Sequence, residues 1–415
     1  MPGAGTVILR RGLVLLFSFV LIIIIVSAII EGTGYSENIY KAIISETVRG
    51  EIEAFRQRAG VNVAKAMVDW LQNYISKPES KGIVDKPLMD RIQNVISKAQ
   101  EDINKVDVGE LYSIYKEIRT RELKIEMGLA EIRDGEYVLV PAYRRMWIMV
   151  TKCLTLDFGE TDKVGVTNVV PRDAPAKVID VIAAVLPRTI LIVTTAEVLL
   201  IVIALLVGPR IVYRYGTILD KFVVAYAAAM TAIPIWWLAM VFLSIFSYRL
   251  GLFPTDLRGV VGVLSDFWRN PAHNFLILLW YISLPLIVIL ITGLGGWLYG
   301  MRAMLLRVVR EDYVTAAKAR GLPERLITRR YILKPSLAPV LTNVILALAG
   351  SLGGMIITES VFNWPGMGTL YYAAITEGDS STIAALSTIY IGIYMVARFI
   401  LEVLYIIVDP RIRAK

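Results

Sequence analysis

The stretch "EDYVTAAKARGLPERLITRRYILKPSLAP", residues 311–339, interrupts a chain that is otherwise dominated by long apolar runs. Its first part predicts a short helix, because the acidic pair at Glu311 and Asp312 suits the positive end of the helix dipole and the alanines that follow are strong helix formers. Gly321 is placed to end this helix in the left-handed conformation. A second, basic helix is then expected at about Pro323–Leu333.

Three interpretations of this stretch compete. A plain solvated connector would not need this composition, and most linkers between packed helices are shorter. A helix-turn-helix that binds DNA has similar punctuation, but about thirty residues tied at both ends to a membrane leave no room for its core. Small residues on a sharply capped helix let another protein approach the backbone, so a docking element fits best.

The composition of the whole chain indicates a membrane protein. Of 415 residues, 56% are hydrophobic and only 19% are charged, and the mean hydropathy is +0.60. Six apolar runs are long enough to cross about 30 Å of hydrocarbon as helices. The predicted spans are Leu13–Ile30, Ile190–Val207, Phe222–Phe246, Phe275–Leu298, Val340–Ile357 and Ile383–Val408. We therefore expect an all-α, polytopic membrane protein with six transmembrane helices.

The basic residues fix the expected orientation. With both termini in the cytoplasm, the cytoplasmic segments hold the Lys and Arg clusters, including Arg411, Arg413 and Lys415. The short external loops hold only Arg249, Arg258 and Arg269. This asymmetry follows the positive-inside rule and accounts for the net charge of +8 without any nucleic acid. The first run is longer than a signal-peptide core and lacks a clear cleavage site, so we expect it to remain as an anchor.

The chain divides into three parts on this topology. Residues 1–30 form the cytoplasmic N-terminus and first span, 31–187 an external, mostly helical region, and 188–415 a core with five spans. That core includes a cytoplasmic loop at 300–339. Apolar residues at helical spacing in the external region predict helices that pack on one another, and "RDGEYVLV" predicts a turn and a short strand. A docking surface for an external partner is the alternative for this region.

The sequence offers no catalytic or nucleotide-binding constellation. Cys153 and His273 are the only residues of their types, so an internal disulfide and a histidine-cluster metal site are both excluded. No G-x-S-x-G motif is supported by a histidine, and no G-x-x-x-x-G-K-[ST] motif is present to hold phosphates. We expect no enzyme activity and no cofactor in this chain, so any energy for transport must come from another subunit.

The stretch at 311–339 resembles the cytoplasmic "EAA" loop of ABC-importer permeases. The family pattern runs Glu-Ala-Ala, three residues, Gly, nine residues, Ile-x-Leu-Pro. Ala316, Ala317, Gly321 and Leu333 match this pattern, whereas Thr315 replaces the glutamate. Tyr331 and Lys334 also depart from it, and the final proline comes one place late, at Pro335. These departures resemble the B-type permeases of dipeptide, oligopeptide and nickel importers, whose loop reads like "TARAKGL…LKPAL".

Other segments resemble the same subfamily, in the same order along the chain. "TESVFNWPGMGTL" (358–370) is similar to its external "ETVFSWPGMG" loop, and "RFILEVLYIIVDPRIR" (398–413) to its C-terminal "NLLVDLLYALLDPRIR". "IPIWWLAMVFLSIFSYRLGLFPT" (233–255), "LDFGET" (156–161) and "VLPRTILI" (185–192) also resemble its segments. The resemblance covers the first helix and about 144–415, which leaves about 36–140 as an extra or divergent external region.

The resemblance implies a type I ABC-importer permease fold with a helical extracytoplasmic insertion after the first helix. It also implies a heterodimer with a C-type permease, two ATP-binding subunits that hold ATP and Mg²⁺, and an external solute-binding protein. The helix in the loop would then be a coupling helix that inserts into the ATPase. The residues expected to couple to the ATPase are Tyr313, Thr315, Ala316, Ala317, Arg320, Gly321, Leu322 and Leu333.

Polar residues in and near the spans are candidates for the translocation path or its gate. Glu197 inside the second span either lines the path or makes a contact between helices. Arg398 and Glu402, four residues apart on the last span, are expected to pair with each other. The external loop holds three more candidates, for which a rigid turn with a Trp anchored at the membrane interface is the alternative. These are Glu359, Trp364 and Gly366.

The sequence does not determine which substrate is transported. The resemblance favours dipeptides or oligopeptides, with oligosaccharides or nickel complexes carried on the same architecture as the alternative. Two other classes of protein fit the sequence less well. An ATP-independent transporter would not need the Ala-Ala…Gly loop, and a membrane-anchored receptor would account for the external region but not for five further spans.

Overall fold

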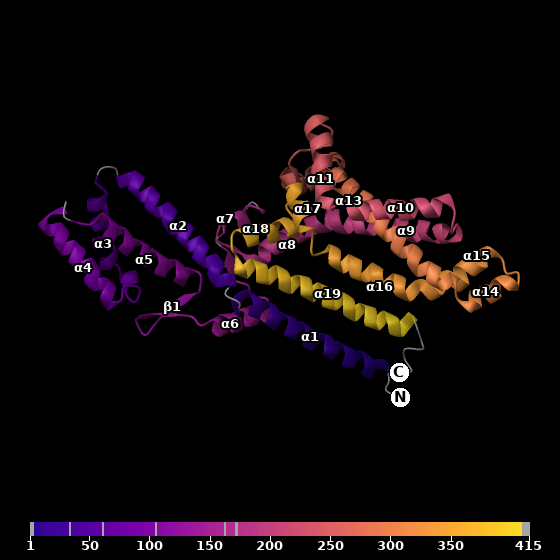
Figure 1. Ribbon diagram of the computed structural model, residues 1–415, viewed down its shortest axis with the longest axis horizontal. Helices are drawn as coiled ribbons and strands as arrows, with labels where there is room; N and C mark the ends of the chain where they lie inside the picture. Colours follow the sequence, from indigo (N-terminus) through magenta and orange to yellow (C-terminus); the bar gives the residue numbers. More distant parts are fainter. Residues whose placement is uncertain are drawn as a thin grey trace. The chain divides into compact units, whose positions relative to one another are not determined.

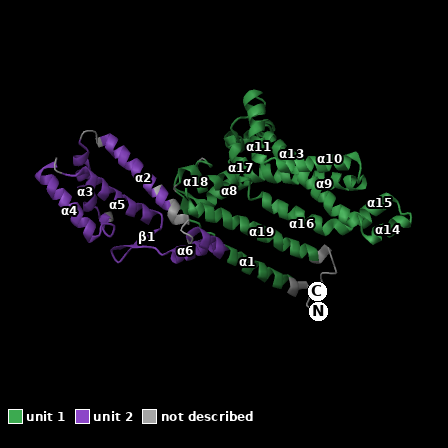
Figure 2. Cartoon of the chain, in the orientation of Figure 1, with its two compact units in different colours: residues 1–22, 156–415 green, residues 23–155 purple. Residues whose placement is uncertain are grey.

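The structure is a computed structural model that describes residues 4–32, 35–59, 62–103, 106–161, 163–170 and 173–408. It is mostly helical (Figure 1). The chain forms two compact units (Figure 2): unit 1 contains residues 1–22 and 156–415, and unit 2 contains residues 23–155. The first helix, α1 (Ala4–Gly32), contributes residues to both.

Unit 2 is a helical domain with its own apolar core. Its elements after α1 are α2 (Tyr35–Ala59), α3 (Val63–Ser76), the 3₁₀ turn η2 (Pro78–Ser80), α4 (Lys86–Glu101), α5 (Val108–Glu126), β1 (Ala130–Arg133), β2 (Glu136–Leu139) and α6 (Ala142–Thr155). The apolar faces of α3, α4 and α5 meet in one buried cluster that includes Met67, Leu71, Ile92 and Ile114. The amphipathic pattern predicted this packing, because such faces bury against one another when no membrane covers them.

The predicted turn and short strand at "RDGEYVLV" form a hairpin of two antiparallel strands, β1 and β2. The two turn residues, Asp134 and Gly135, both have positive φ angles, of 53° and 84°. An Asp-Gly pair adopts this conformation readily, and the resulting tight turn matches the twist of the strands. The hairpin leads directly into α6.

Unit 1 contains the long apolar helices. Its elements after α1 are β3 (Glu160–Thr161), α7 (Val164–Thr167), β4 (Ala176–Lys177), α8 (Val178–Thr189), η4 (Ile190–Thr194), α9 (Thr195–Tyr213), α10 (Ile218–Ala232), α11 (Ile235–Phe242), η5 (Leu243–Arg249), η6 (Leu257–Gly259), α12 (Val260–Ser265), η7 (Phe267–Arg269), α13 (Pro271–Val309), α14 (Asp312–Ala319), α15 (Glu324–Leu326), η8 (Ile327–Leu333), α16 (Lys334–Ser351), α17 (Ile356–Val361), α18 (Met367–Thr376) and α19 (Ser380–Val408). Segments η4, η5 and η8 are π-helical.

Five helices in the described part of the chain are long and apolar enough to cross a membrane. A sixth span is complete if the bent pair of α10 with α11 and η5 is counted as one. The five are Ile8–Glu31, Val178–Tyr213, Pro271–Val309, Glu324–Ser351 and Ser380–Tyr405. The predicted all-α, polytopic fold is therefore confirmed. The C-terminal basic residues at 409–415, used above to orient the chain, lie outside the described residues.

The span predicted as one helix at Phe222–Phe246 is broken. Ile218–Ala232 and Ile235–Arg249 meet at an angle of 86°. The break lies at Ile233 and Pro234, where Ile233 has an extended conformation with ψ of 119°. Proline disfavours the helical conformation in the residue before it and has no N–H to continue the hydrogen-bond ladder, so the helix stops here.

The span predicted at Val340–Ile357 is shifted. The helix begins at Glu324 and ends at Ser351, and Ile357 lies in the separate short helix α17. Accordingly, the basic helix expected at about Pro323–Leu333 is the start of this long helix rather than a separate element. Pro335 explains why the segment before α16 is π-helical. It has no N–H to donate to the carbonyl of Tyr331, and its ring crowds that carbonyl.

Helix α13 is the central element of unit 1. It packs along α9 and α10, while α16 packs on α19. One apolar cluster gathers around the first half of α13, with Leu200, Val288 and Trp364 among its buried members. A second cluster surrounds its last turns and holds the short helix α14.

Candidate functional site

The short helix α14 has a complete C-terminal cap. Gly321 has a φ of 69°, as predicted. Its N–H donates to the carbonyl of Lys318 at 2.9 Å, and the N–H of Leu322 donates to the carbonyl of Ala317 at 3.4 Å. This pair of bonds is the Schellman motif, which satisfies carbonyls that the helix would otherwise leave free. The helix therefore ends sharply, and the chain turns back toward α15.

The two faces of α14 differ. Val314 and Ala317 are buried in the cluster at the end of α13. The rest of the helix surface is exposed to solvent. Of the predicted coupling residues, the structure places Tyr313, Thr315, Ala316, Arg320 and Gly321 on this exposed surface, and buries or half-buries Ala317, Leu322 and Leu333.

The buried face of α14 sits in a cluster that also includes residues of α9, α10, α13, η8 and α16. Ile211 of α9, Leu305 of α13, Ile327 of η8 and Val340 of α16 belong to it. Leu322 and Leu333 are half-buried against the same cluster. These residues of the predicted coupling set therefore hold α14 against the cluster, whereas the exposed alanines form the surface that another molecule can reach.

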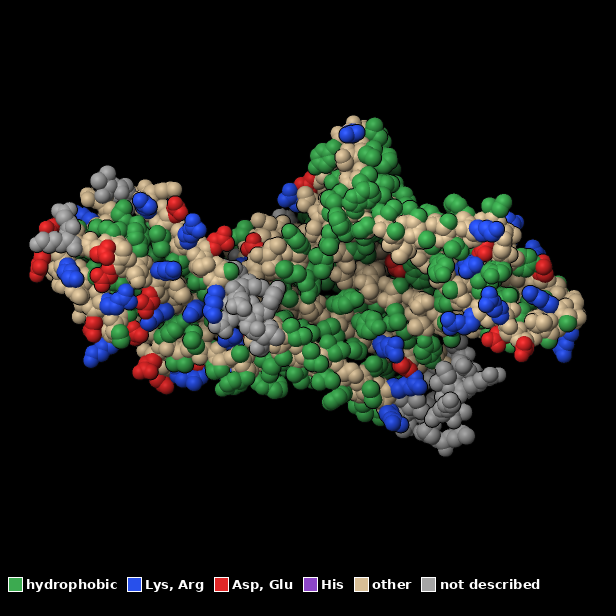
Figure 3. Space-filling model, viewed as in Figure 1, with side chains coloured by type: hydrophobic (Ala, Val, Ile, Leu, Met, Phe, Trp, Pro, Cys, Tyr) green, Lys and Arg blue, Asp and Glu red, His purple; other side chains and the backbone are tan. Residues whose placement is uncertain are grey.

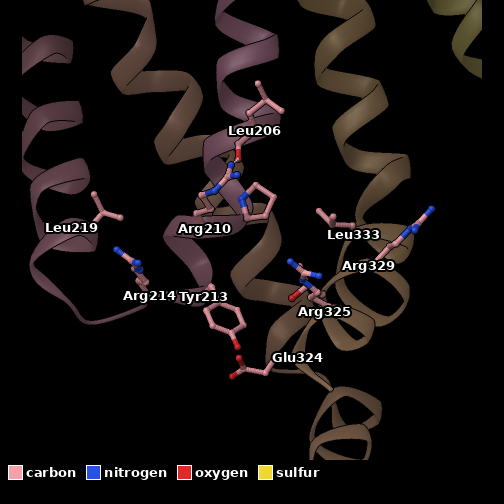
Figure 4. A pocket seen from close by; sticks show the side chains of 11 residues that line it. Leu206, Arg210, Tyr213, Arg214, Leu219, Glu324, Arg325, Arg329 and Leu333 are labelled. Carbon is pink, nitrogen blue, oxygen red and sulfur yellow. Dashed lines mark hydrogen bonds between the residues drawn. The ribbon is translucent and has the colours of Figure 1, made fainter. Parts of the chain in front are cut away.

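A pocket of about 800 Å³ opens between the end of α9 and the segment formed by α15 and η8 (Figure 4). In this view Arg210 and Arg214 reach it from the α9 side, and Arg325 and Arg329 from α15 and η8. Glu324 is the one acidic side chain that lines it. Figure 3 shows basic side chains gathered over this end of unit 1. Such a surface suits carboxylate or phosphate groups.

A buried ion pair, which the sequence reasoning did not find, ties this end of the bundle together. Asp220 at the start of α10 pairs with Arg302 of α13, and one of its carboxylate oxygens accepts a bond of 3.0 Å from Arg302. The same carboxylate accepts the N–H of Gly216 at 3.0 Å. The Arg302 guanidinium also lies over the ring of Tyr215, 5.4 Å from its centre. The available signal was a charged residue inside each of two apolar helices, since such residues need a partner.

The loop with Glu359, Trp364 and Gly366 is built around one buried carboxylate. Glu359 accepts hydrogen bonds from the backbone N–H groups of Met355, Gly368 and Thr369 at 3.1, 2.9 and 3.4 Å. It also accepts a bond from the hydroxyl of Thr189 at 3.3 Å. A side chain at Gly366 would collide with both Glu359 and Thr189, so this close approach requires glycine.

Trp364 is 1% exposed, and its indole N–H donates to the carbonyl of Arg188 at 3.1 Å. An anchor at the membrane interface would leave its ring open to lipid headgroups, so the anchor interpretation is wrong for this residue. Instead, Trp364 and Glu359 fasten the loop to the junction of α8 and η4. The sequence contained this junction in the segment "VLPRTILI", but it did not reveal that the two segments meet.

The remaining candidates lie apart from one another. Glu197 accepts a bond of 2.9 Å from the indole N–H of Trp297 on α13, so it makes the contact between helices that was one of its two expected roles. The predicted pairing of Arg398 with Glu402 is wrong: Glu402 pairs with Arg11 of α1. Arg398 lies on an exposed face of α19. Helical spacing permitted the local pair, but an arginine from another helix reaches the carboxylate instead.

Comparison with known proteins identifies the family. A family model described as binding-protein-dependent transport system inner membrane component matches residues 200–414, just over half of the chain. The chain belongs to this family. It is therefore a multi-pass protein of the inner membrane, and the membrane component of a transport system that depends on a binding protein. The matched residues include α13, α14 and the loop around Glu359.

Individual relatives match beyond that region. The chain is 29% identical over 256 residues to the oligopeptide transport system permease protein AppB of Bacillus subtilis. This alignment covers 62% of this chain and 76% of AppB. It is 28% identical over 219 residues to the di/tripeptide transport system permease protein DppB of Pseudomonas aeruginosa, covering 50% and 65%. The oligopeptide transport system permease protein OppB of Haemophilus influenzae is 25% identical over 285 residues, covering 69% and 85%.

The first prediction concerns the Asp220–Arg302 pair. Asp220→Asn leaves the Arg302 charge without a countercharge in a site where Asp220 is only 4% exposed. Breaking a buried pair in this way costs about 3–5 kcal/mol. We expect a clearly lower thermal unfolding temperature for the purified protein in nanodiscs. The matched control is Asp256→Asn, which breaks the exposed pair with Arg258 and should cost about 0–1 kcal/mol. Equal shifts in the two variants would contradict the structural role of Asp220.

The second prediction concerns pH. Burial raises the pKa of the Glu359 carboxyl from 4.5 to about 7, although the hydrogen bonds from backbone amides and Thr189 favour the charged form. Between these values the folded state retains a proton that the unfolded chain releases. The stability contributed by this group is thus complete below pH 4.5 and falls as the pH rises to 7, by up to about 3 kcal/mol.

Glu359→Gln removes this titration and adds a change that does not depend on pH. We therefore expect the unfolding temperature of wild type, relative to that of Glu359→Gln, to fall between pH 5 and about pH 7 and to level off toward pH 8. Scanning fluorimetry of both proteins in the same nanodiscs measures this difference. A constant difference across that range would show that Glu359 does not carry the shifted titration.

Proposed function

We propose that this chain is a permease subunit of an ATP-driven importer of dipeptides or oligopeptides. The observation that carries the proposal is the sharply capped helix α14, which presents exposed alanines at the matched Thr315–Gly321 motif. The family supplies the transport role, and several relatives are named as oligopeptide or dipeptide permeases. The same architecture could carry oligosaccharides or nickel complexes, which remains the alternative.

In this proposal the α14 end of unit 1 faces the cytoplasm, as do both termini. The basic residues around the pocket support that orientation, since Lys and Arg accumulate on the cytoplasmic side of membrane proteins. The segment of unit 2 from α2 to β2 then lies outside the cell. Glu197, Glu359, Trp364, Gly366, Arg398 and Glu402 remain proposed residues of the path or its gate; the contacts of Glu359, Trp364 and Gly366 favour a role in shaping the gate loop.

The proposed assembly contains a homologous C-type permease, two ATP-binding subunits and an external solute-binding protein. ATP and Mg²⁺ belong to the ATP-binding subunits. Their closure would move α14, and because α14 contacts α13 and η8 and shares one buried cluster with α9 and α16, those helices would move with it. Alternation between two arrangements of the permease pair would follow, with the nucleotide state biasing the equilibrium.

The third prediction tests the docking surface. Ala316 is exposed and makes no contribution to the buried cluster, so Ala316→Trp should leave the fold intact while blocking close approach of a partner. We expect the unfolding temperature to stay unchanged, and both co-purification of the ATP-binding subunits and ATP-dependent uptake to fall by at least about tenfold, a loss of about 1.4 kcal/mol in binding.

The control is Ala54→Trp, which changes an exposed helical alanine in unit 2. It should retain recruitment and uptake. Gly321→Asp provides an independent test, because a side chain at this positive φ strains the cap of α14. It should leave the protein in the membrane and uncouple it from the ATP-binding subunits. If Ala316→Trp recruited the ATP-binding subunits and transported normally, the assignment of α14 would be wrong. An ATP-independent transporter would purify without ATP-binding subunits and transport without ATP.

The fourth prediction concerns the substrate. We expect the solute-binding protein encoded in a neighbouring reading frame to carry short peptides when it is purified under native conditions. Native mass spectrometry of that protein, followed by competition for uptake by the assembled transporter, identifies the ligand. Oligosaccharides or a nickel complex in its site would overturn the peptide assignment and leave the importer architecture unchanged.

A further inference from the structure

Helix α6 carries an exposed apolar strip. Tyr143, Trp147 and Leu154 are 67%, 52% and 46% exposed. Their spacing of four and seven residues places them on one side of the helix. A strip that contains Trp and Tyr is unusual on a surface that faces only water, and these two residues are enriched where proteins meet the membrane interface.

A buried ion pair fixes α6 to the membrane-spanning helix α1. Arg145 donates from Nε to the carboxylate of Glu31 at 2.9 Å, and both side chains are largely buried. Arg145 also donates to the carbonyl of Val140 at 2.7 Å. Glu31 is the last residue of the candidate span Ile8–Glu31. The first turn of α6 therefore lies where α1 leaves the apolar layer.

The buried residues of the two helices follow matching steps. Most of them recur every four residues, back from Glu31 on α1 and onward from the largely buried Arg145 on α6, and Ile30 and Val150 are buried beside these steps. With the ion pair as the fixed point, this pattern fits α6 running antiparallel along the last turns of α1, toward the middle of the span. The steps are Ile23, Ser27 and Glu31 on α1, and Arg145, Met149 and Cys153 on α6.

The polar groups on the exposed side of α6 are compatible with lipid. The hydroxyl of Thr151 donates to the carbonyls of Trp147 and Ile148, and that of Thr155 donates to the carbonyls of Thr151 and Lys152. Hydroxyls bonded to their own helix need no water. Lys152 can extend its ammonium group toward the headgroups along its alkyl chain.

We propose that α6 is inserted in the membrane leaflet that holds the Glu31 end of α1, with the strip Tyr143–Trp147–Leu154 facing the acyl chains. The occupant of this face is lipid because it continues a lipid-facing surface: Ile25 and Ile29 of the same turns of α1 are also exposed. Figure 3 shows hydrophobic side chains gathered over α6. A partner protein that covers the strip is the alternative, and the test distinguishes the two.

The test uses spin labels in the assembled transporter in nanodiscs. The sole cysteine is removed by Cys153→Ala, and single cysteines are introduced by Tyr143→Cys, Trp147→Cys and Leu154→Cys. The ratio of collision rates with oxygen, which concentrates in lipid, to those with a water-soluble nickel chelate is measured at each. Ile29→Cys on α1 is the lipid reference, and Gln93→Cys on an exposed position of α4 is the water reference.

We expect the ratio at all three positions to exceed that at Gln93→Cys, to be similar at 147 to that at Ile29→Cys, and to be highest at 154, which the antiparallel arrangement places deeper in the leaflet than Ile29. Three positions keep the test valid if one variant fails to fold. A nickel-dominated ratio would place the strip in water, and labels that neither reagent reaches would place it under a partner protein. Either result overturns the proposal, and neither bears on the role of α14.

Discussion

The packing of Val314 and Ala317 into the cluster at the end of α13 is the contact on which the proposed mechanism depends. A helix of eight residues is too short to be stable alone, so α14 exists because this contact and its cap hold it. The same cluster includes residues of α9, η8 and α16. A force applied to the exposed face of α14 must therefore act on several long helices at once, since closely packed interiors deform little.

Buried acidic residues reinforce two places in unit 1 through the donors that surround them. At the α14 end, Asp220 is surrounded by the Arg302 guanidinium and the Gly216 amide. In the loop before α19, Glu359 collects three backbone amides and a hydroxyl. A carboxylate in an apolar bundle persists only when such donors surround it, and the donors come from segments that would otherwise separate. Each acid thereby specifies which helices meet.

The sequence predicted what local forces decide and missed what distant segments decide. The cap at Gly321 follows from glycine's freedom at positive φ, and the long helices follow from hydropathy, so both were predicted. The break at Pro234 was predictable from the proline, although its angle of 86° depends on packing. The partner of Glu402 was not predictable, because Arg11 lies 391 residues away and competes with a local alternative. The burial of Trp364 depends likewise on α8.

Unit 2 shows how a large domain can be accommodated between two spans. Its core, which includes Leu71, Ile92 and Ile114, is complete without any residue of the family-matched region at 200–414. The chain enters the unit along α1 and leaves it along α6, and the Glu31–Arg145 pair holds these two segments together. Because the entry and exit are tied at one point, the loop between them can lengthen at a small entropic cost. Helix α6 is thus placed by its contact with α1, whatever the length of the domain between them.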